Sequence, residues 1–333
     1  MSMRHALLAS TTLLASAAAA DVNIYTTRQP SLIEPVVQGF TDATGINVNL
    51  AYVDGAIAEK LKAEGARSPA DLVMTVDIAN LAQVVDAGVV APLQNDALES
   101  AIPATLRDPD GKWFAVTTRA RVIYASKERV ADGEVTTYED LTDPKWEGRI
   151  CTRSGTHNYN LALLSAVIAH HGEEAAKTWA EGLKANLARK PQGNDRAQVK
   201  AIWAGECDIS IGNTYYMGAM LGDAEQTEWA NSVRLVFPTF DDGGSHVNIS
   251  GVSLLEGAPH RDEAIQFLEY LVSPEAQAIY AEANFEYPVL EEAALSDLVA
   301  SWGEITPDSI ALSEIAAHRA AALRIMEEVD FDG

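Results

Sequence analysis

The side chains best suited to chemistry in this sequence are three tyrosines, the adjacent pair Tyr215 and Tyr216, and Tyr159 in a polar, glycine-containing segment. Phenolate oxygens are hard donors, and a cluster of them favours a hard, highly charged cation such as Fe(III). Three phenolates balance the charge of a trivalent ion, whereas a divalent ion leaves surplus negative charge in a desolvated site. The pattern predicts a metal-capturing cleft. The alternative is that the tyrosines pack an interface with their hydroxyls hydrogen-bonded.

The segment around the tyrosine pair allows both side chains to reach one ion. Successive side chains of a strand point to opposite faces, and neighbours on a helix diverge by about 100 degrees. Adjacent tyrosines therefore converge only at a turn or at the first residues of a helix. Gly212-Asn213 ends a strand-like run, and Met217 begins a helix-like one. The sequence thus predicts that Tyr215 and Tyr216 lie at a strand-to-helix junction.

Protons compete with a metal ion for these oxygens. A free phenol has a pKa of about 10, so an ordinary tyrosine is protonated at neutral pH and is a poor ligand. A trivalent ion stabilises the phenolate, and metal uptake then releases protons. We therefore expect metal binding to weaken as the pH falls.

The elements that must position the tyrosines follow an α/β pattern. A strand is predicted at residues 22–26, then a helix that begins at residue 30, has its apolar face at residues 32–40 and is ended by Gly45, and then a strand at residues 46–52. Together they form a β-α-β unit. The chain of 333 residues is longer than one ordinary core holds, which favours two domains. We expect a two-lobed α/β protein.

The predicted lobes have the following boundaries. Residues 1–20 are a signal peptide, residues 21–118 and 248–333 form the N-terminal lobe with the C-terminal helices, and residues 119–247 form the C-terminal lobe. The first crossing between the lobes falls at Thr117 to Arg121. All three tyrosines then belong to the C-terminal lobe and face the cleft between the two lobes.

The first twenty residues have the composition of a secretory signal. Arg4 precedes an apolar run from Ala6 to Leu14, and small residues lead to Ala20. This run is too short to span a membrane, and a buried N-terminal helix is the alternative. We therefore expect export to the periplasm. The formal charge of −24 repels nucleic acid and anionic membranes, and we expect a monomer that binds neither.

Cys151 and Cys207 are the only cysteines, and each lies beside one of the tyrosine segments. An even number of cysteines in an oxidising compartment favours a disulfide, which would join both segments within one lobe. The alternative is two free, buried thiols, because the distance between the cysteines does not follow from the sequence.

Five segments resemble the ferric-ion-binding periplasmic proteins of ABC-type iron importers, which have the two-lobed type II substrate-binding fold. They are residues 23–28 (NIYTTR), 143–149 (DPKWEGR), 154–160 (SGTHNYN), 212–216 (GNTYY) and 284–289 (NFEYPV). The resemblance implies a hinge of crossing strands between the lobes. It also implies capture of Fe(III) by the phenolates of Tyr159, Tyr215 and Tyr216. An inner-membrane ABC permease is the implied partner.

The chain departs from many relatives directly after Arg28. Those relatives carry a histidine, or a histidine and a tyrosine, where this chain has Gln29-Pro30. Pro30 has no ligand atom in its side chain and Gln29 is a weak neutral donor. The resemblance therefore leaves coordination positions for water or for a small synergistic anion such as carbonate.

Several polar residues are candidates to hold that anion or to support the phenolates. Arg119 and Arg121 are two residues apart in an extended stretch and share a face, and Arg28 is a third cation. The alternative for these arginines is a surface ion pair. In relatives that bind an accompanying anion, the positions that match Ser154, Gly155 and Asn213 contribute, which implies the same role for these residues here.

Other polar residues are weaker candidates. His157 is near Tyr159 in the sequence, but an exposed position in a loop is the favoured interpretation. Asp54 and Asp77 follow predicted strands of the first lobe, at the ends where α/β proteins bind ligands, and are candidate outer-shell partners.

Two other functions compete with iron capture. The first keeps the fold but binds a small anion or organic acid through Arg119, Arg121 and Asn213. The second is a secreted enzyme, but the sequence contains no G-x-S-x-G, no H-E-x-x-H and no closely spaced His/Cys/Asp set. We predict a binding protein and not an enzyme.

Overall fold

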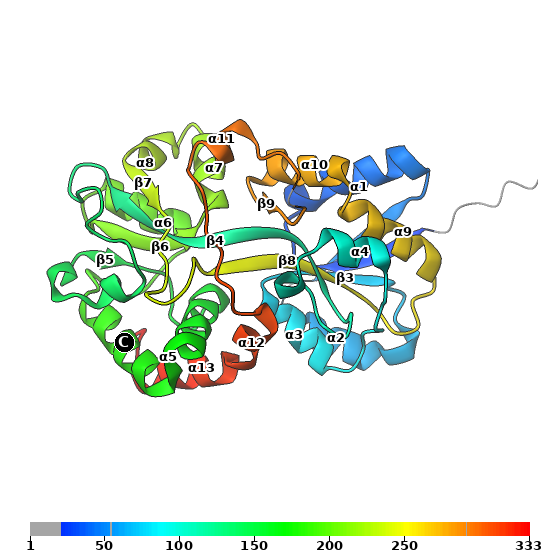
Figure 1. The fold of residues 1–333 in the computed structure, drawn as a ribbon, viewed down its shortest axis with the longest axis horizontal. Helices are drawn as coiled ribbons and strands as arrows, with labels where there is room; N and C mark the ends of the chain where they lie inside the picture. Colours follow the sequence, from blue (N-terminus) through cyan, green and yellow to red (C-terminus); the bar gives the residue numbers. More distant parts are fainter. Residues whose placement is uncertain (1–20, 54, 291) are drawn as a thin grey trace, which may run out of the picture.

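The computed structural model describes residues 21–53, 55–290 and 292–333, and the predicted signal peptide lies outside them. Two lobes are joined by two long strands that run from one lobe into the other (Figure 1). The strands of the described residues are β1 (Val22–Thr26), β2 (Val48–Tyr52), β3 (Leu72–Val76), β4 (Phe114–Ser126), β5 (Ile150–Cys151), β6 (Ile209–Asn213), β7 (Val233–Val236), β8 (Val247–Leu254) and β9 (Tyr287–Pro288).

The strands pair in the order β2-β1-β3-β8-β4-β6-β5, and β7 and β9 both pair with β4. β1 is parallel to β2 and β3, and β5 is parallel to β6, whereas β8 is antiparallel to both β3 and β4. We call the lobe built on β1, β2 and β3 the first lobe, and the lobe built on β5, β6 and β7 the second lobe.

β4 and β8 connect the lobes. β4 is buried along its whole length. Its first part pairs with β8, with Phe114 opposite Val252 and Ala120 opposite Val247. Its second part pairs with β6 and β7 of the second lobe. The segment from Thr117 to Arg121, predicted as a crossing between the lobes, lies within this strand.

Helices cover both lobes. They are α1 (Pro30–Thr44), α2 (Ile57–Glu64), α3 (Ile78–Asp86), α4 (Asp96–Ala101), α5 (Asn158–Ala185), α6 (Asp195–Trp203), α7 (Tyr215–Leu221), α8 (Thr227–Asn231), α9 (Arg261–Leu271), α10 (Pro274–Asn284), α11 (Asp297–Ala300), α12 (Leu312–Ala317) and α13 (Arg319–Glu328). Among the described helices, none combines the length and the apolar composition that a membrane span requires.

The first β-α-β unit forms as the sequence predicts. Pro30 occupies the first turn of α1, where a missing N–H costs no helical hydrogen bond. Ile33, Val36 and Phe40 form the buried face. Gly45 ends the helix with φ 75°, a left-handed conformation that glycine adopts without strain. The helix therefore ends at Thr44, directly before Gly45, as the sequence predicts.

The two cysteines form a disulfide in the second lobe, as the sequence favoured. Cys151 in β5 and Cys207 just before β6 have Cα atoms 5.9 Å apart and are separated by 56 residues in the chain. Closing a loop of this length in the unfolded chain corresponds to about 4 kcal/mol in the chain-entropy model. The disulfide thus joins the strand that precedes the Tyr159 segment to the strand that precedes the tyrosine pair.

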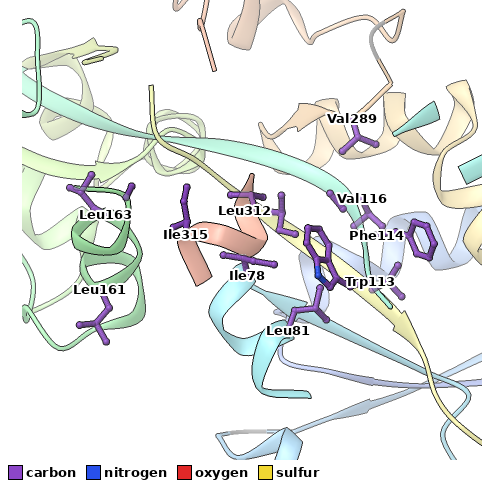
Figure 2. Close-up of a cluster of buried hydrophobic side chains, with 14 of the residues drawn as sticks. Ile78, Leu81, Trp113, Phe114, Val116, Leu161, Leu163, Val289, Leu312 and Ile315 are labelled. Atoms are coloured by element: carbon purple, nitrogen blue, oxygen red, sulfur yellow. The ribbon is translucent and has the colours of Figure 1, made fainter. Parts of the chain in front are cut away.

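A continuous apolar core runs across the boundary between the lobes. α12 contacts α3 of the first lobe and α5 of the second. Leu312 and Ile315 of α12 lie between Ile78 of α3 and Leu163 of α5 (Figure 2). α9 and α10 contact α1 of the first lobe, whereas α13 contacts α5 of the second. The predicted residue boundaries of the lobes stay a prediction.

Candidate metal centre

A polar cleft of about 660 Å³ lies between the two lobes. Side chains from both lobes line it, and the three predicted tyrosines are among them. The lining residues are Thr27, Arg28, Gln29, Ser31, Leu32, Gly55, Val76, Asn80, His157, Asn158, Tyr159, Arg196, Tyr215, Tyr216, Ala219, Ala283, Asn284, Phe285 and Glu286.

Tyr159 is held at the start of α5. The imidazole of His157, the N-cap residue, accepts a hydrogen bond from the Tyr159 amide at 3.2 Å. The His157 ring also lies edge-on to the Tyr159 ring, with centroids 4.7 Å apart. Burial and the nearby Arg153 lower the pKa of His157 to about 4, so this imidazole is neutral at pH 7 and available as an acceptor.

Tyr215 and Tyr216 are the first two residues of α7, directly after β6 ends at Asn213. Their rings lie 4.3 Å apart at an angle of 40°. The hydroxyl oxygen of Tyr215 is 3.1 Å from that of Tyr159. The strand-to-helix junction therefore places the tyrosine pair beside Tyr159, and all three side chains line one cleft.

Tyr159 and Tyr215 resist ionisation while the cleft holds no cation. Desolvation, followed by the nearby Tyr216, raises the pKa of Tyr159 to about 12, and Arg119 partly opposes this rise. Desolvation, then Tyr159 and Tyr216, raises the pKa of Tyr215 well above its ordinary value. Each phenolate thus disfavours the next one. A trivalent cation among the three oxygens would reverse this balance.

Arg119 is a buried cation behind the tyrosines. Its side chain is 1% exposed, and within the described part of the chain its three guanidinium nitrogens have no hydrogen-bond partner. The guanidinium carbon lies 6.0 Å from the centre of the Tyr159 ring. An unpartnered buried guanidinium is costly unless a negative group approaches it. The tyrosines beside Arg119 become such a negative group when they ionise to phenolates.

Arg121 lies on the same face of β4 as Arg119, but both of its terminal nitrogens, Nη1 and Nη2, have hydrogen-bond partners. Its Nη1 donates to Asp195 at 2.8 Å and to Asn213 Oδ1 at 3.1 Å, and its Nη2 donates to Asn160 at 2.7 Å. The Asp195 carboxylate is 0% exposed. It also accepts from Arg153 at 3.1 Å and from the Asn213 amide at 3.1 Å. Asp195 thereby positions the end of β6, immediately before the tyrosine pair.

Arg28 and Gln29 enter the cleft from the first lobe. Arg28 is buried, and its Nη2 donates to Glu286 at 2.8 Å while its Nη1 donates to Ser250. Burial alone would lower the pKa of Arg28, but the Glu286 carboxylate raises it overall. Gln29 is exposed at the N-cap of α1 and makes no capping hydrogen bond with its side chain.

Ser154 and Gly155 contact a carboxylate of the same chain. The Ser154 hydroxyl donates to Asp332 at 2.5 Å, and the Gly155 amide donates to the same side chain at 2.7 Å. Neither residue lines the cleft. Asn213 is buried among Arg121 and Asp195, and its Nδ2 has no partner in the described residues. The structure thus groups Asn213 with the arginines and places Ser154 and Gly155 against Asp332.

The remaining sequence candidates lie apart from the phenols. Asp77 is buried at the N-cap of α3 with φ 81°, and its carboxylate accepts from Asn248 at 2.9 Å. Burial raises the pKa of Asp77 to about 6, and Arg119 opposes the rise. Asp54 lies outside the described residues. Within residues 21–53, 55–290 and 292–333, no three His, Cys, Asp or Glu side chains are grouped as a metal site requires.

Several cleft residues were not predicted from the sequence. They come from the first lobe (Asn80, Phe285 and Glu286) and from the second (Asn158 and Arg196). Asn158, Phe285 and Glu286 lie within segments that carry the family resemblance, which is the only signal that the sequence offered for them. Asn80 and Arg196 are surface-type residues on helices, and nothing in their local sequence marks them.

Two lobes that enclose a polar cleft, joined by crossing strands, define a solute-binding protein. The chain matches the family model of the bacterial extracellular solute-binding proteins over residues 67–303 and belongs to this family. Members of the family bind solutes and are not enzymes, which confirms the prediction made from the absence of catalytic motifs.

Proteins whose names or titles refer to iron match nearly the whole chain. Iron uptake protein A1 of Synechocystis sp. is 43% identical over 313 residues, covering 92% of this chain and 86% of the relative. The apo ferric ion-binding protein A of Pasteurella haemolytica is 47% identical with a TM-score of 0.89, covering 94% of this chain and 98% of that one. A Trichodesmium protein in complex with iron and citrate is 40% identical with a TM-score of 0.90, covering 94% and 100%. These similarities confirm the predicted family and two-lobed fold.

Proposed function

We propose that this protein captures Fe(III) in the cleft through the phenolate oxygens of Tyr159, Tyr215 and Tyr216 and delivers it to an inner-membrane ABC permease. The observation that carries the proposal is the 3.1 Å separation between the hydroxyl oxygens of Tyr159 and Tyr215, from two helices whose first residues face one cleft. Oxygens this close can share one cation. The names of the similar proteins, which refer to ferric iron and iron uptake, support the same cargo.

The charge of the site favours a trivalent ion. Three phenolates carry three negative charges, which balance the charge of Fe(III). Arg119 adds one positive charge, which an accompanying anion would balance, and its guanidinium nitrogens have no hydrogen-bond partner in the described residues. A small anion such as carbonate, placed between Arg119 and the metal, would satisfy both the guanidinium and the coordination positions that Gln29 does not fill. The relative solved with iron and citrate supports an anion as a second ligand.

The alternative cargo, a small anion or organic acid without iron, is not favoured. Arg121, one of the three residues predicted to bind such a ligand, is already paired with Asp195, and the Asn213 Oδ1 accepts from Arg121. Ser154 and Gly155 are paired with Asp332. Among the predicted arginines, Arg119 alone has no hydrogen-bond partner for any of its guanidinium nitrogens within the described residues, and the Asn213 Nδ2 also lacks a partner there.

The working environment follows from the family. Its members are extracellular solute-binding proteins, and residues 1–20 have the composition of a secretory signal peptide. We assign the protein to the periplasm as a monomer. We propose the lobe boundaries that the sequence predicts, residues 21–118 and 248–333 for the first lobe and residues 119–247 with all three ligands for the second, although α13 packs against α5 of the second lobe.

An optical titration tests the proposed function. Ferric ions bound to phenolates absorb visible light, so adding ferric citrate to the purified apoprotein should produce a colour that saturates at one iron per chain. Metal analysis of the desalted protein gives the stoichiometry. A protein that stays colourless with ferric citrate, while its melting temperature rises with phosphate or an organic acid, would support the anion alternative.

Removing the Arg119 charge should change stability and iron affinity in opposite directions. In Arg119→Met, the apoprotein loses a buried guanidinium whose nitrogens have no hydrogen-bond partner in the described residues. Below about pH 6, where the buried Asp77 is protonated and does not need the arginine charge, its unfolding free energy should therefore rise by about 1 kcal/mol. The phenolates lose the cation that favours them, so ferric affinity should fall roughly tenfold. Urea unfolding and competition with a chelator measure the two effects. Arg324→Met, at an exposed ion pair with Glu173, removes the same charge and should change neither.

A further inference from the structure

The two lobes touch on both sides of the cleft. On one side, Asn158 at the start of α5 donates to Asn80 of α3 at 2.9 Å. On the other side, α7 of the second lobe contacts α10 of the first. There the Phe285 ring packs against the backbone of Gly218, which lies one turn after the tyrosine pair. The cleft is therefore bridged by one polar contact and one apolar contact.

Gly218 has no room for a side chain. A methyl group added at its Cα would overlap the ring of Phe285, closer than real Cβ atoms approach their neighbours. The Phe285 ring therefore packs directly on the backbone of α7 at Gly218. Phe285 follows α10 of the first lobe and Gly218 belongs to α7 of the second, so this contact exists only while the lobes are close together.

Phe285 itself has an unusual backbone. It ends α10 with φ 55° and ψ 30°, the left-handed conformation in which helices commonly place glycine. A bulky residue there is uncommon and is strained. Hydrogen bonds made by the residues on either side of it hold this backbone in place. The Asn284 side chain donates to the Leu32 carbonyl at 2.9 Å, and the Glu286 carboxylate accepts from Arg28 and from Thr117, each at 2.8 Å.

We infer that the contact between Phe285 and Gly218 holds the lobes closed over the bound cargo and sets the rate at which iron leaves. The inference rests on the proposed function. The three tyrosines belong to one lobe and can bind iron before the lobes meet, whereas the ring completes the enclosure from the other lobe. Losing the contact therefore speeds release and leaves the coordinating oxygens in place.

Gly218 is the better position for a test than the polar contact, because Asn158 is adjacent to Tyr159 and its replacement would disturb a ligand. Alanine has a higher helix propensity than glycine, so Gly218→Ala does not weaken α7 itself. Gly222, at the C-terminal end of the same helix, provides a matched control. A methyl group there meets only backbone oxygens at 3.7 and 3.8 Å, which is ordinary contact.

The experiment follows the decay of the ferric colour in excess EDTA for the wild type, Gly218→Ala, Phe285→Ala, the double variant and Gly222→Ala. We expect release to be roughly tenfold faster in both single variants at Gly218 and Phe285, because differences of this kind fall mainly on the dissociation rate. The double variant should release iron no faster than either single variant, since both remove the same contact. Gly222→Ala should behave as the wild type.

The outcomes separate the two proposals. A wild-type protein that takes up no ferric iron would overturn the proposed function, and this inference with it. A wild-type protein that binds iron, with wild-type release from both Gly218→Ala and Phe285→Ala, would overturn the inference alone. Two effects that multiply in the double variant would also overturn it, because they would show that the residues act independently.

Discussion

Tyr215→Phe should leave a folded protein that no longer develops the ferric colour. The substitution removes one hydroxyl, which lies 3.1 Å from the Tyr159 hydroxyl in the cleft. Without the third phenolate, the site loses both a hard oxygen ligand and one of the negative charges that balance Fe(III). Ferric affinity should therefore fall by more than the roughly 10- to 100-fold that the loss of an outer-shell partner costs. Competition against citrate, followed in the visible spectrum, measures it.

Tyr280→Phe is the matched control for this substitution. The Tyr280 hydroxyl is buried in the first lobe and has no hydrogen-bond partner among the described residues, and the residue does not line the cleft. Removing it should change neither colour nor affinity. A Tyr215→Phe protein that binds iron as tightly as Tyr280→Phe would show that the phenolate at position 215 is not a ligand.

Iron affinity should depend very steeply on pH. Without iron Tyr159 and Tyr215 are protonated, because the pKa of Tyr159 is raised to about 12 and that of Tyr215 is raised well above its ordinary value. Binding through three phenolates then releases three protons, so protons compete more strongly as the pH falls. Each released proton contributes about tenfold per pH unit, so affinity should fall by up to roughly a thousandfold per unit.

The slope of this dependence counts the protons. Affinity is measured against a chelator of known protonation between about pH 5 and pH 8. In Tyr159→Phe the slope of log affinity against pH should decrease by about one, because one fewer proton is displaced. A wild-type slope below one would be incompatible with capture by several protonated phenols.

Local sequence rules were sufficient for the tyrosine pair and for the disulfide. Gly212 and Asn213 were predicted to end the strand after Ile211, but they are the last two residues of β6. The residues from Met217 onward favour a helix, so the junction at Tyr215 and Tyr216 still follows from neighbours in the chain. The pairing of Cys151 with Cys207 followed from their number and the expected compartment. The junction depends only on residues that are adjacent in the sequence, and the disulfide had only one possible pairing.

The roles of the predicted arginines and of Ser154 and Gly155 depend on contacts with residues that are distant in the chain. Arg119 and Arg121 were predicted to share a face, but their different roles depend on Asp195, which reaches Arg121 from 74 residues away. Ser154 and Gly155 were assigned to an external anion, yet a carboxylate 178 positions along the chain from Ser154 contacts them. No local pattern indicates which acidic side chain, among the many in this chain, arrives at a given cation or amide.

The position of α12 limits how the two lobes can separate. Leu312 and Ile315 are each 2% exposed between α3 and α5, and burial of two such side chains stabilises the protein by roughly 3 to 6 kcal/mol. Pulling the lobes straight apart would hydrate both side chains. A rotation of one lobe about an axis through α12 would keep both side chains buried and would open the cleft on the opposite side. The cargo would then enter and leave between α7 and α10, and the lobes would stay in contact on the side where α12 packs.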